Sequence, residues 1–212
     1  MATKVDDLQL MIQKLCLRLG TALPSGSTGR AIAVTSAKAG EGKTFLACAL
    51  AIQLARSGEG PVLLVDANFD RPAIHARLKI PVTPSLQDCL KDGSVDVDEF
   101  YRAENLPLAV LAAGEKCAPA LLFHESRSRE FLEEVRPKFS WIVFDTAALG
   151  RSGANSLLHA VDGVLLVVDS KSTRRQVVAN ELANLEIARE RILGVVLNRK
   201  EYPVPSLIYK LT

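Results

Sequence analysis

The sequence predicts a three-layer α/β/α fold around a mostly parallel sheet of about six to seven strands. Short apolar runs alternate with helical segments along the chain, which is typical of a parallel sheet covered on both faces. A glycine-rich loop joins the first run to the next helix, and two of the runs end in an aspartate. The 212 residues can bury a full core, so we expect one domain over residues 1–212.

The expected elements follow in chain order. Residues 5–20 have apolar side chains at helical spacing and precede a loop at 24–29, so an N-terminal helix and loop occupy 1–29. Strands are predicted at 31–34, 62–66, 108–111, 141–145, 163–168 and 192–198. Further helices are predicted at 45–55, 85–90 (with Ser85 as N-cap), 119–137 as one or two helices, 152–160 and 173–189. Residues 200–212 form a C-terminal tail.

The composition is that of an ordinary globular protein. Hydrophobic residues make up 48% of the chain and the net charge is +2, so we expect no nucleic-acid partner. No apolar run approaches the ~18–20 residues of a membrane span, and the first residues lack a signal-peptide pattern. The four cysteines have no C-x-x-C spacing, which indicates a reducing compartment. We therefore expect a cytoplasmic protein, which a partner could recruit to the inner face of the membrane.

Residues 36–44 (SAKAGEGKT) carry the strongest motif in the sequence. The strand–loop–helix layout directs backbone N–H groups and the positive helix end at one point, where a phosphate can bind. In the P-loop pattern G-x-x-x-x-G-K-[ST], the lysine reaches the β- and γ-phosphates and the hydroxyl binds Mg²⁺. Here Lys43 and Thr44 match, but Ala37 stands where the first glycine belongs. The alternative is an ordinary glycine-rich turn before a helix that starts with lysine.

Two aspartates stand at predicted strand ends. Asp66 follows residues 62–65 and Asp145 follows residues 141–144. Ligands of open α/β sheets bind beyond the carboxyl ends of the strands, so both aspartates should share an edge with the loop. An apolar strand that ends in aspartate is a Walker B element, which holds Mg²⁺ directly or through water. The alternative role for each aspartate is a helix cap or a surface salt bridge.

The combined motifs resemble the bacterial tyrosine kinases of the Min/Par superfamily with a deviant Walker A motif. Lys38 resembles the signature lysine of that motif. Residues 62–72 (VLLVDANFDRP) are similar to the second aspartate motif of those kinases, and residues 141–146 (WIVFDT) resemble their Walker B. The segments 160–168 and 194–199 are similar to their later strands. The resemblance covers roughly residues 30–200 and implies the fold of a P-loop NTPase.

The resemblance implies a role for each site residue. Lys43 and the loop would hold the phosphates of ATP, and Asp66 would act near the γ-phosphate as a base or as a ligand of metal-bound water. Lys38 would reach phosphate in its own or a neighbouring subunit; alternatively, it is a solvated surface lysine. The implied nucleotide contacts are Lys38, Gly40, Glu41, Gly42, Lys43, Thr44, Phe45 and, against adenine, Asn198. The implied catalytic residues are Asp66 and Lys43, and the implied Mg²⁺ ligands are Thr44, Asp66 and Asp145.

The chain departs from the pattern of the resembled kinases in several places. Asn68 stands for the second aspartate of Asp-x-Asp-x-Arg, and Asp70 for the arginine. Two alanines at 147–148 replace the usual prolines after the Walker B motif, and the Glu-x-x-Arg-x-x-Arg helix of ring assembly is not visible in residues 1–22. The tail offers two tyrosines, Tyr202 and Tyr209. These departures leave autophosphorylation and ring assembly open.

Three functions fit these observations. The first is an ATP-dependent tyrosine kinase that regulates exopolysaccharide or capsule biosynthesis with a membrane polysaccharide co-polymerase, the chain-length regulator. The second is a kinase-deficient ATPase or nucleotide-binding regulatory module of the same machinery. The third is a Min/Par-type positioning ATPase. Each would bind ATP and Mg²⁺, and a homo-oligomer remains open in all three.

Overall fold

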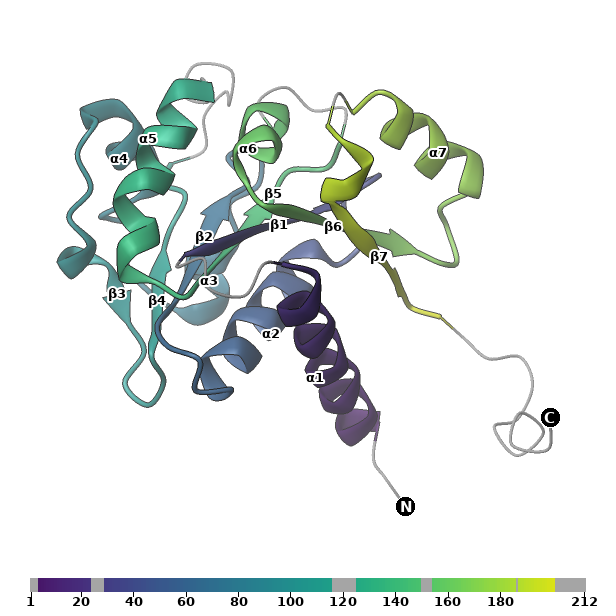
Figure 1. Cartoon of the computed structure of the whole chain (residues 1–212), viewed down its shortest axis with the longest axis horizontal. Helices are drawn as coiled ribbons and strands as arrows, with labels where there is room; N and C mark the ends of the chain where they lie inside the picture. Colours follow the sequence, from purple (N-terminus) through teal and green to yellow (C-terminus); the bar gives the residue numbers. More distant parts are fainter. Residues whose placement is uncertain (1–3, 24–28, 116–124, 150–153, 186, 201–212) are drawn as a thin grey trace.

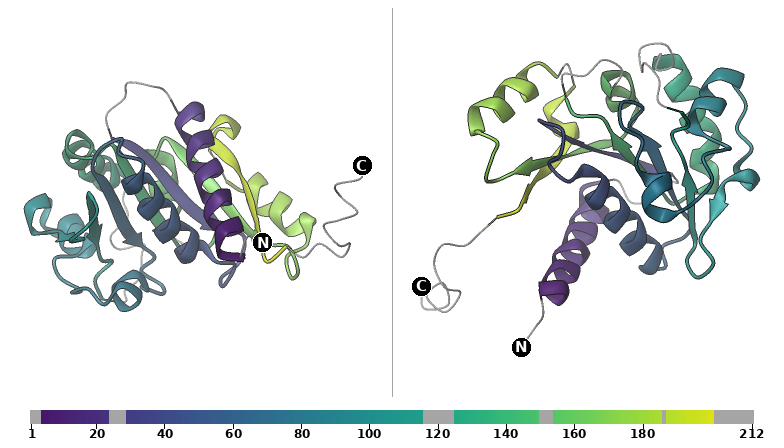
Figure 2. Two further views of the ribbon diagram at one scale, coloured as in Figure 1. Left: turned by 90° about the horizontal axis from the view of Figure 1, so that it is seen from below. Right: turned by 180° about the vertical axis from the view of Figure 1, so that it is seen from behind.

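The computed structural model describes residues 4–23, 29–115, 125–149, 154–185 and 187–200. A twisted sheet lies between two helical layers (Figure 1). Helices α1 and α2 cover one face, and α5, α6 and α7 cover the other, as the turned views in Figure 2 also show. The structure therefore confirms the predicted three-layer α/β/α fold.

The described part of the chain has seven strands and seven α-helices, with short 3₁₀ turns between some of them. The helices are α1 (Lys4–Ala22), α2 (Lys43–Arg56), α3 (Ile74–Leu78), α4 (Leu86–Asp92), α5 (Glu125–Val135), α6 (Ala154–Ala160) and α7 (Arg175–Ala183). The strands are β1 (Arg30–Ser36), β2 (Val62–Ala67), β3 (Tyr101–Arg102), β4 (Leu108–Leu111), β5 (Trp141–Thr146), β6 (Gly163–Asp169) and β7 (Ile192–Asn198).

The strand order among the described residues is β3-β4-β2-β5-β1-β6-β7. Every neighbouring pair is parallel except β3 and β4. In the register of β2 and β5, Asp66 stands directly opposite Asp145. The carboxyl end of β1, where the glycine-rich loop begins, lies next to β5. This order brings both aspartates and the loop to one edge of the sheet.

Each face of the sheet has its own apolar core. Under α1, α2 and α3, the core contains Trp141, Leu50 and Ile74, each fully buried. The core on the opposite face includes Phe144 and Leu158. Strands buried on both faces read as continuous apolar runs rather than alternating ones, which explains why their positions were predictable.

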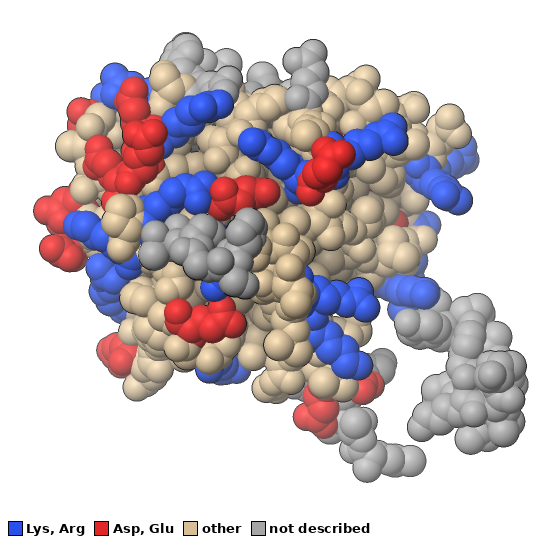
Figure 3. Space-filling view, in the orientation of Figure 1, with Lys and Arg blue, Asp and Glu red and all other residues tan. Residues whose placement is uncertain are grey.

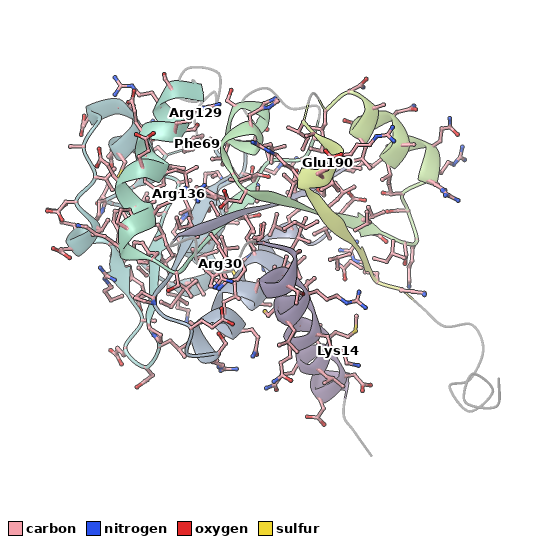
Figure 4. All side chains as sticks on the ribbon, viewed as in Figure 1. Lys14, Arg30, Phe69, Arg129, Arg136 and Glu190 are labelled. Atoms are coloured by element: carbon pink, nitrogen blue, oxygen red, sulfur yellow. The ribbon has the colours of Figure 1, made fainter. Side chains whose placement is uncertain are left out.

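The amino ends of the strands are closed by ion pairs rather than left open. Arg136 makes two hydrogen bonds to the Asp162 carboxylate, at 2.8 and 2.9 Å, and one to the Gly29 carbonyl at 2.6 Å. Arg30 pairs with Glu59 at 2.8 Å and stacks on the ring of Trp141. Figure 4 labels Arg30 and Arg136 at this edge. The opposite edge therefore remains as the place for a ligand.

Three details differ from the sequence-based expectations. The short elements α3 and β3 were not predicted. The helix expected at 173–189 is wrong in extent, because α7 ends at Ala183 and a 3₁₀ turn occupies 189–191. Leu185 and Ile187 are both 8% exposed, and two residues spaced by two cannot bury the same face of a helix. The chain therefore leaves the helix in order to bury them.

Other expectations hold where the structure describes the chain. Ser85 caps α4 in a reciprocal capping box with Asp88. The segment expected to be helical at 119–137 contains α5, but its residues 119–124 lie outside the described part, as do Cys117, Tyr202 and Tyr209. Lys and Arg alternate with Asp and Glu over the face in Figure 3, so this face has no field of a single sign.

Candidate nucleotide-binding site

The loop after β1 leads into α2, whose N-terminus has no side-chain cap. Gly42 is the N-cap of α2, and it provides no side-chain hydrogen bond to the first turn. The first N–H groups of a helix have no partner within the helix, and the helix dipole makes this end positive. These donors face the cavity that Lys43 and Thr44 line. The loop is therefore built to accept an anion.

Glycine is required at 42 for two separate reasons. Its φ is +104°, a left-handed conformation in which side chains are strained. A Cβ at this position would also collide with the side-chain amide of Asn198. Gly40 has a φ of +86° but open space around it. Ala37 is buried and is not among the described residues with positive φ, so glycine's freedom is not needed where the motif departs from the P-loop pattern.

A cavity of about 520 Å³ lies against this loop. Its volume falls within the range of small-molecule sites. The wall comes from the loop and α2, from the segment after β2, from the two alanines after β5 and from the end of β7. The alanine segment is tied to β1, because the Ala147 carbonyl accepts a hydrogen bond from the Thr35 hydroxyl at 2.9 Å. The cavity thus lies at the carboxyl edge of the sheet, as predicted.

The surroundings of the Asp145 carboxylate fit the role of a metal ligand. Its side chain is fully buried, and neither carboxylate oxygen has a hydrogen-bond partner among the described residues. Burial raises the pKa of Asp145 to about 7, the nearby Thr44 hydroxyl and Lys43 lower it, and Asp66 raises it. A buried carboxylate without partners is costly unless a cation compensates it. Asp145 and Thr44 therefore fit the Mg²⁺ role predicted for them.

The oxygen donors of Asp145 and Thr44 suit Mg²⁺, which does not need a complete set of protein ligands. The described residues contain no group of three or more His, Cys, Asp or Glu side chains that could hold a metal ion. Mg²⁺ usually binds through one or two carboxylates and completes its shell with water and phosphate oxygens. One free carboxylate beside a hydroxyl and a phosphate-binding loop matches that requirement.

Lys43 is held in the cavity wall with its amine largely removed from water. The residue is 6% exposed, and burial lowers the pKa of its amine. The charges of Asp145 and Glu41 act in the opposite direction, whereas Arg71 lowers the pKa further. A desolvated cation beside uncapped N–H groups strengthens a site for phosphate.

Asp66 is buried and engaged by the backbone. One carboxylate oxygen accepts the N–H of Asn68 at 3.1 Å, and the other accepts those of Ala73 at 2.9 Å and Ile74 at 3.0 Å. Burial raises the pKa of Asp66, and these N–H groups lower it. The observed role of Asp66 is to shape the segment after β2. Its role beside the γ-phosphate or the metal stays a prediction.

Glu41 turns away from the cavity and braces the loop. Its carboxylate accepts the N–H of Lys38 at 2.7 Å, the N–H of Asp169 at 3.0 Å and the hydroxyl of Thr173 at 2.5 Å. The side chain is 2% exposed. Glu41 therefore links the loop to the end of β6, and a nucleotide could meet only its backbone.

The end of β7 holds the other side of the loop. The Asn198 amide donates to the Glu41 carbonyl at 2.8 Å. Arg199 donates to Asp169 at 2.6 Å and to the Gly40 carbonyl at 3.2 Å. Lys171 N–H and Arg199 both lower the pKa of Asp169. Asn198 lines the cavity, but its contact with adenine stays a prediction because the observed amide bond positions the loop.

Lys38 and Phe45 differ in their relation to the cavity. Lys38 is exposed and does not line it, whereas Phe45 lines it and is 49% exposed. Lys38 is therefore accessible to a neighbouring subunit or to solvent, and both readings of this lysine remain.

Arg71, Arg77 and Arg199 were not among the predicted site residues. All three line the cavity. Arg199 directly follows Asn198 at a strand end, a signal that could have identified it. Arg77 lies eleven residues beyond Asp66, and only the fold of α3 brings it to the same edge.

The fold and this site define a P-loop nucleotide-binding domain. The comparisons with known proteins then identify its family. The chain matches the CobQ/CobB/MinD/ParA nucleotide binding domain over residues 32–208, and it belongs to that family.

The relatives within this family include bacterial tyrosine kinases. The chain is 29% identical to tyrosine-protein kinase YwqD of Bacillus subtilis over 174 residues, which cover 81% of this chain and 73% of the relative. It is 29% identical over 183 residues to the succinoglycan biosynthesis transport protein ExoP of Rhizobium meliloti, covering 84% of this chain but 23% of the relative. Both findings agree with the resemblance read from the motifs.

Solved structures support the same relationship. The VpsO kinase domain superposes with a TM-score of 0.78 at 30% identity, covering 94% of this chain and all of that domain. MinD of Aquifex aeolicus shares the fold, with a TM-score of 0.68 at 22% identity over 86% of this chain and 73% of that one. Among the described residues, no helix is both long and apolar enough to span a membrane.

Proposed function

We propose that the protein binds ATP with Mg²⁺ and transfers its γ-phosphoryl group to tyrosine, in a system that makes an exopolysaccharide or capsule. The observation that carries this proposal is that the uncapped start of α2 lies beside the Asp145 carboxylate, on which Thr44 and Lys43 of that helix act. The first feature binds phosphate, and the second fits the metal that accompanies it. The kinase activity is supported by relatives such as YwqD and the VpsO kinase domain.

Each group in or beside the cavity has a proposed task. The N–H groups of the loop and Lys43 bind the phosphates, and Asp145 and Thr44 hold Mg²⁺, which supplies electrostatic stabilisation of the phosphate charge. Asn198 lies where it could contact the base. In the transfer itself, the bond from the γ-phosphorus to the ADP oxygen breaks and a bond to the tyrosine oxygen forms. The phenolic proton passes to a base; for Asp66, three N–H contacts leave less capacity for that role.

The proposed partner is a membrane polysaccharide co-polymerase. Support comes from relatives such as ExoP, whose name refers to succinoglycan biosynthesis transport. Such a partner would place the protein at the cytoplasmic side of the membrane.

A second function is favoured by one specific observation. Asp66 already accepts three backbone N–H groups, and Asn68, two positions further on in the cavity wall, is neutral. Asn cannot act as a base. A nucleotide-binding module that regulates the machinery without phosphotransfer would need no base at either position.

One experiment separates the two functions. The protein is incubated with γ-labelled ATP, Mg²⁺ and the co-polymerase, and phosphotyrosine is measured on both proteins beside calorimetric ATP binding. Lys43→Met serves as the inactive variant and Lys91→Met, an exposed lysine on α4, as the matched control. We expect label on tyrosine with the wild type and Lys91→Met but not with Lys43→Met. Binding without label would favour the regulatory module, and no binding would exclude both functions.

A further inference from the structure

The segment after β2 brings two arginines to the cavity. Arg71 precedes α3 and Arg77 lies within it, and both line the wall together with Lys43 and Thr44. Both side chains are exposed, so their guanidinium groups lie at the rim. Neither forms a salt bridge with another described residue. We call Arg71 and Arg77 the arginine pair.

The arginine pair acts on the same end of the cavity as the proposed metal site. The charge of Arg71 lowers the pKa of Lys43, and the charge of Arg77 lowers the pKa of Asp145. Both arginines are therefore within electrostatic reach of the groups that would meet the β- and γ-phosphates. Arg199 differs from them because it is already bonded to Asp169 and to the Gly40 carbonyl.

The buried carboxylate of Asp66 holds this segment in place. It accepts the N–H groups of Ala73 and Ile74, at the start of α3, and that of Asn68. These three bonds span both sides of Arg71 and fix the start of the helix that carries Arg77. Asn68 is 7% exposed, and its side-chain oxygen has no partner among the described residues. Its neutral amide adds no negative charge that would compete with phosphate for the arginines.

We propose that the arginine pair binds the terminal phosphate of the nucleotide and makes this site discriminate a triphosphate from a diphosphate. The inference rests on the proposed function, because it assumes that the cavity holds a nucleotide. Arginine matches phosphate oxygens with two parallel N–H donors, and such charge-assisted bonds are stronger than neutral ones. ADP lacks the phosphate that the pair would contact. Losing either arginine should therefore weaken the binding of the triphosphate more than the binding of ADP. Asp66 is then a positioning residue for the pair.

The test compares two nucleotides by isothermal titration calorimetry with Mg²⁺ present. The ligands are ADP and AMP-PNP, an ATP analogue with a nitrogen bridge between the β- and γ-phosphates. The variants are Arg71→Gln, Arg77→Gln and both together, with Arg56→Gln at the far end of α2 as the matched control. We expect each single variant to raise the Kd of AMP-PNP about tenfold, because each loses one charge-assisted hydrogen bond to phosphate at the solvated rim of the cavity. The Kd of ADP should change less than threefold, and Arg56→Gln should change neither.

The outcomes separate this inference from the proposed function. Equal weakening of both nucleotides, or no change in either, would overturn the role of the arginine pair while nucleotide binding stands. Failure of the wild type to bind either nucleotide would overturn the proposed function and this inference with it. Thermal unfolding confirms that the variants are folded, and Arg71→Lys and Arg77→Lys, which keep the charge, should recover part of the preference for AMP-PNP.

Discussion

At the scale of single residues, Asp145 is a fully buried carboxyl group without a hydrogen-bond partner among the described residues, and its pKa is raised to about 7. A carboxylate buried without hydrogen bonds destabilises the folded chain when it is ionised. Its pKa near 7 means that the folded protein keeps this proton over a pH range in which the unfolded chain, with a pKa of about 3.9, has released it. The buried Asp145 carboxyl group therefore lowers the free energy of unfolding of the nucleotide-free protein at any pH where the unfolded chain is ionised.

The first prediction follows from that pKa. Unfolding releases the Asp145 proton between about pH 4 and pH 7, so this residue lowers the stability of the free protein as the pH rises through that window. Asp145→Asn should remove this dependence and make the free protein more stable than the wild type at pH 8. The same variant should weaken Mg²⁺-dependent ATP binding at least about tenfold, since a charge-assisted contact is lost.

The measurement is urea unfolding from pH 4 to pH 8 without nucleotide, together with calorimetric binding. Asp98→Asn serves as the control, because that side chain is 89% exposed. Parallel pH profiles for the wild type and Asp145→Asn would contradict the prediction.

At the scale of elements, the site is a junction between the start of α2 and the ends of β6 and β7. Glu41 bonds to the end of β6, and Asn198 and Arg199 bond back to the carbonyls of Glu41 and Gly40. The shape of the loop therefore depends on these strand ends as well as on its own glycines and the Lys38–Glu41 hydrogen bond. These contacts come from β6 and β7, which lie beyond β1 in the strand order.

The second prediction concerns this junction at Gly42. Gly42→Ala should destabilise the folded protein in two ways. The left-handed backbone conformation costs about 1–2 kcal/mol with a side chain, and the new Cβ collides with the Asn198 amide. Gly58→Ala is the matched control, since Gly58 has a φ of +76° with open space around it. We expect Gly42→Ala to lower the free energy of unfolding by at least about 1 kcal/mol more than Gly58→Ala does, beyond the shared strain.

The collision can be isolated by a double-mutant cycle measured by urea unfolding. In an Asn198→Ala background, the cost of Gly42→Ala should fall to that of Gly58→Ala, because the colliding amide is gone. An unchanged cost in that background would show that Asn198 does not constrain position 42.

At the scale of the whole molecule, the two helical layers leave one edge of the sheet for the nucleotide and close the other with ion pairs. Lys38 lies outside the cavity at this edge, because it is exposed to solvent and is not one of the residues that line the cavity. A second copy of the chain or solvent could meet this lysine. Within one chain, it has no contact with the space that the nucleotide would fill.

The third prediction uses that placement. Lys38→Ala should leave the ATP affinity of the dilute monomer within about twofold of the wild type, a change of less than about 0.5 kcal/mol. Lys14→Ala, on the exposed side of α1 (Figure 4), is the matched control. Sedimentation with and without ATP is measured beside the titration, and ATP-driven association that Lys38→Ala abolishes would support a Min/Par-type dimer. A tenfold loss of affinity in the monomer would contradict the placement of Lys38 outside the cavity.

The sequence by itself determined the layered fold, the loop and the two aspartate-tipped strands. Strands buried on both faces need unbroken apolar runs, and the carboxyl ends of parallel strands lie at one edge of the sheet. The sequence could therefore place Asp145 near Lys43 and Thr44, which both act on its pKa in the structure. The extent of α7 was not predictable, since it depends on Leu185 and Ile187 reaching a core formed by distant elements.

Only the tertiary structure decided what each polar group of the site does. Asp66 and Glu41 were predicted from the sequence to bind the nucleotide or its metal, and the structure adds that their carboxylates accept backbone N–H groups and a hydroxyl from neighbouring segments. Arg77 reaches the cavity because α3 turns it back toward the sheet. A hydrogen bond or a charge contact depends on where two groups lie within a few ångströms, and a linear pattern specifies the groups without specifying that distance.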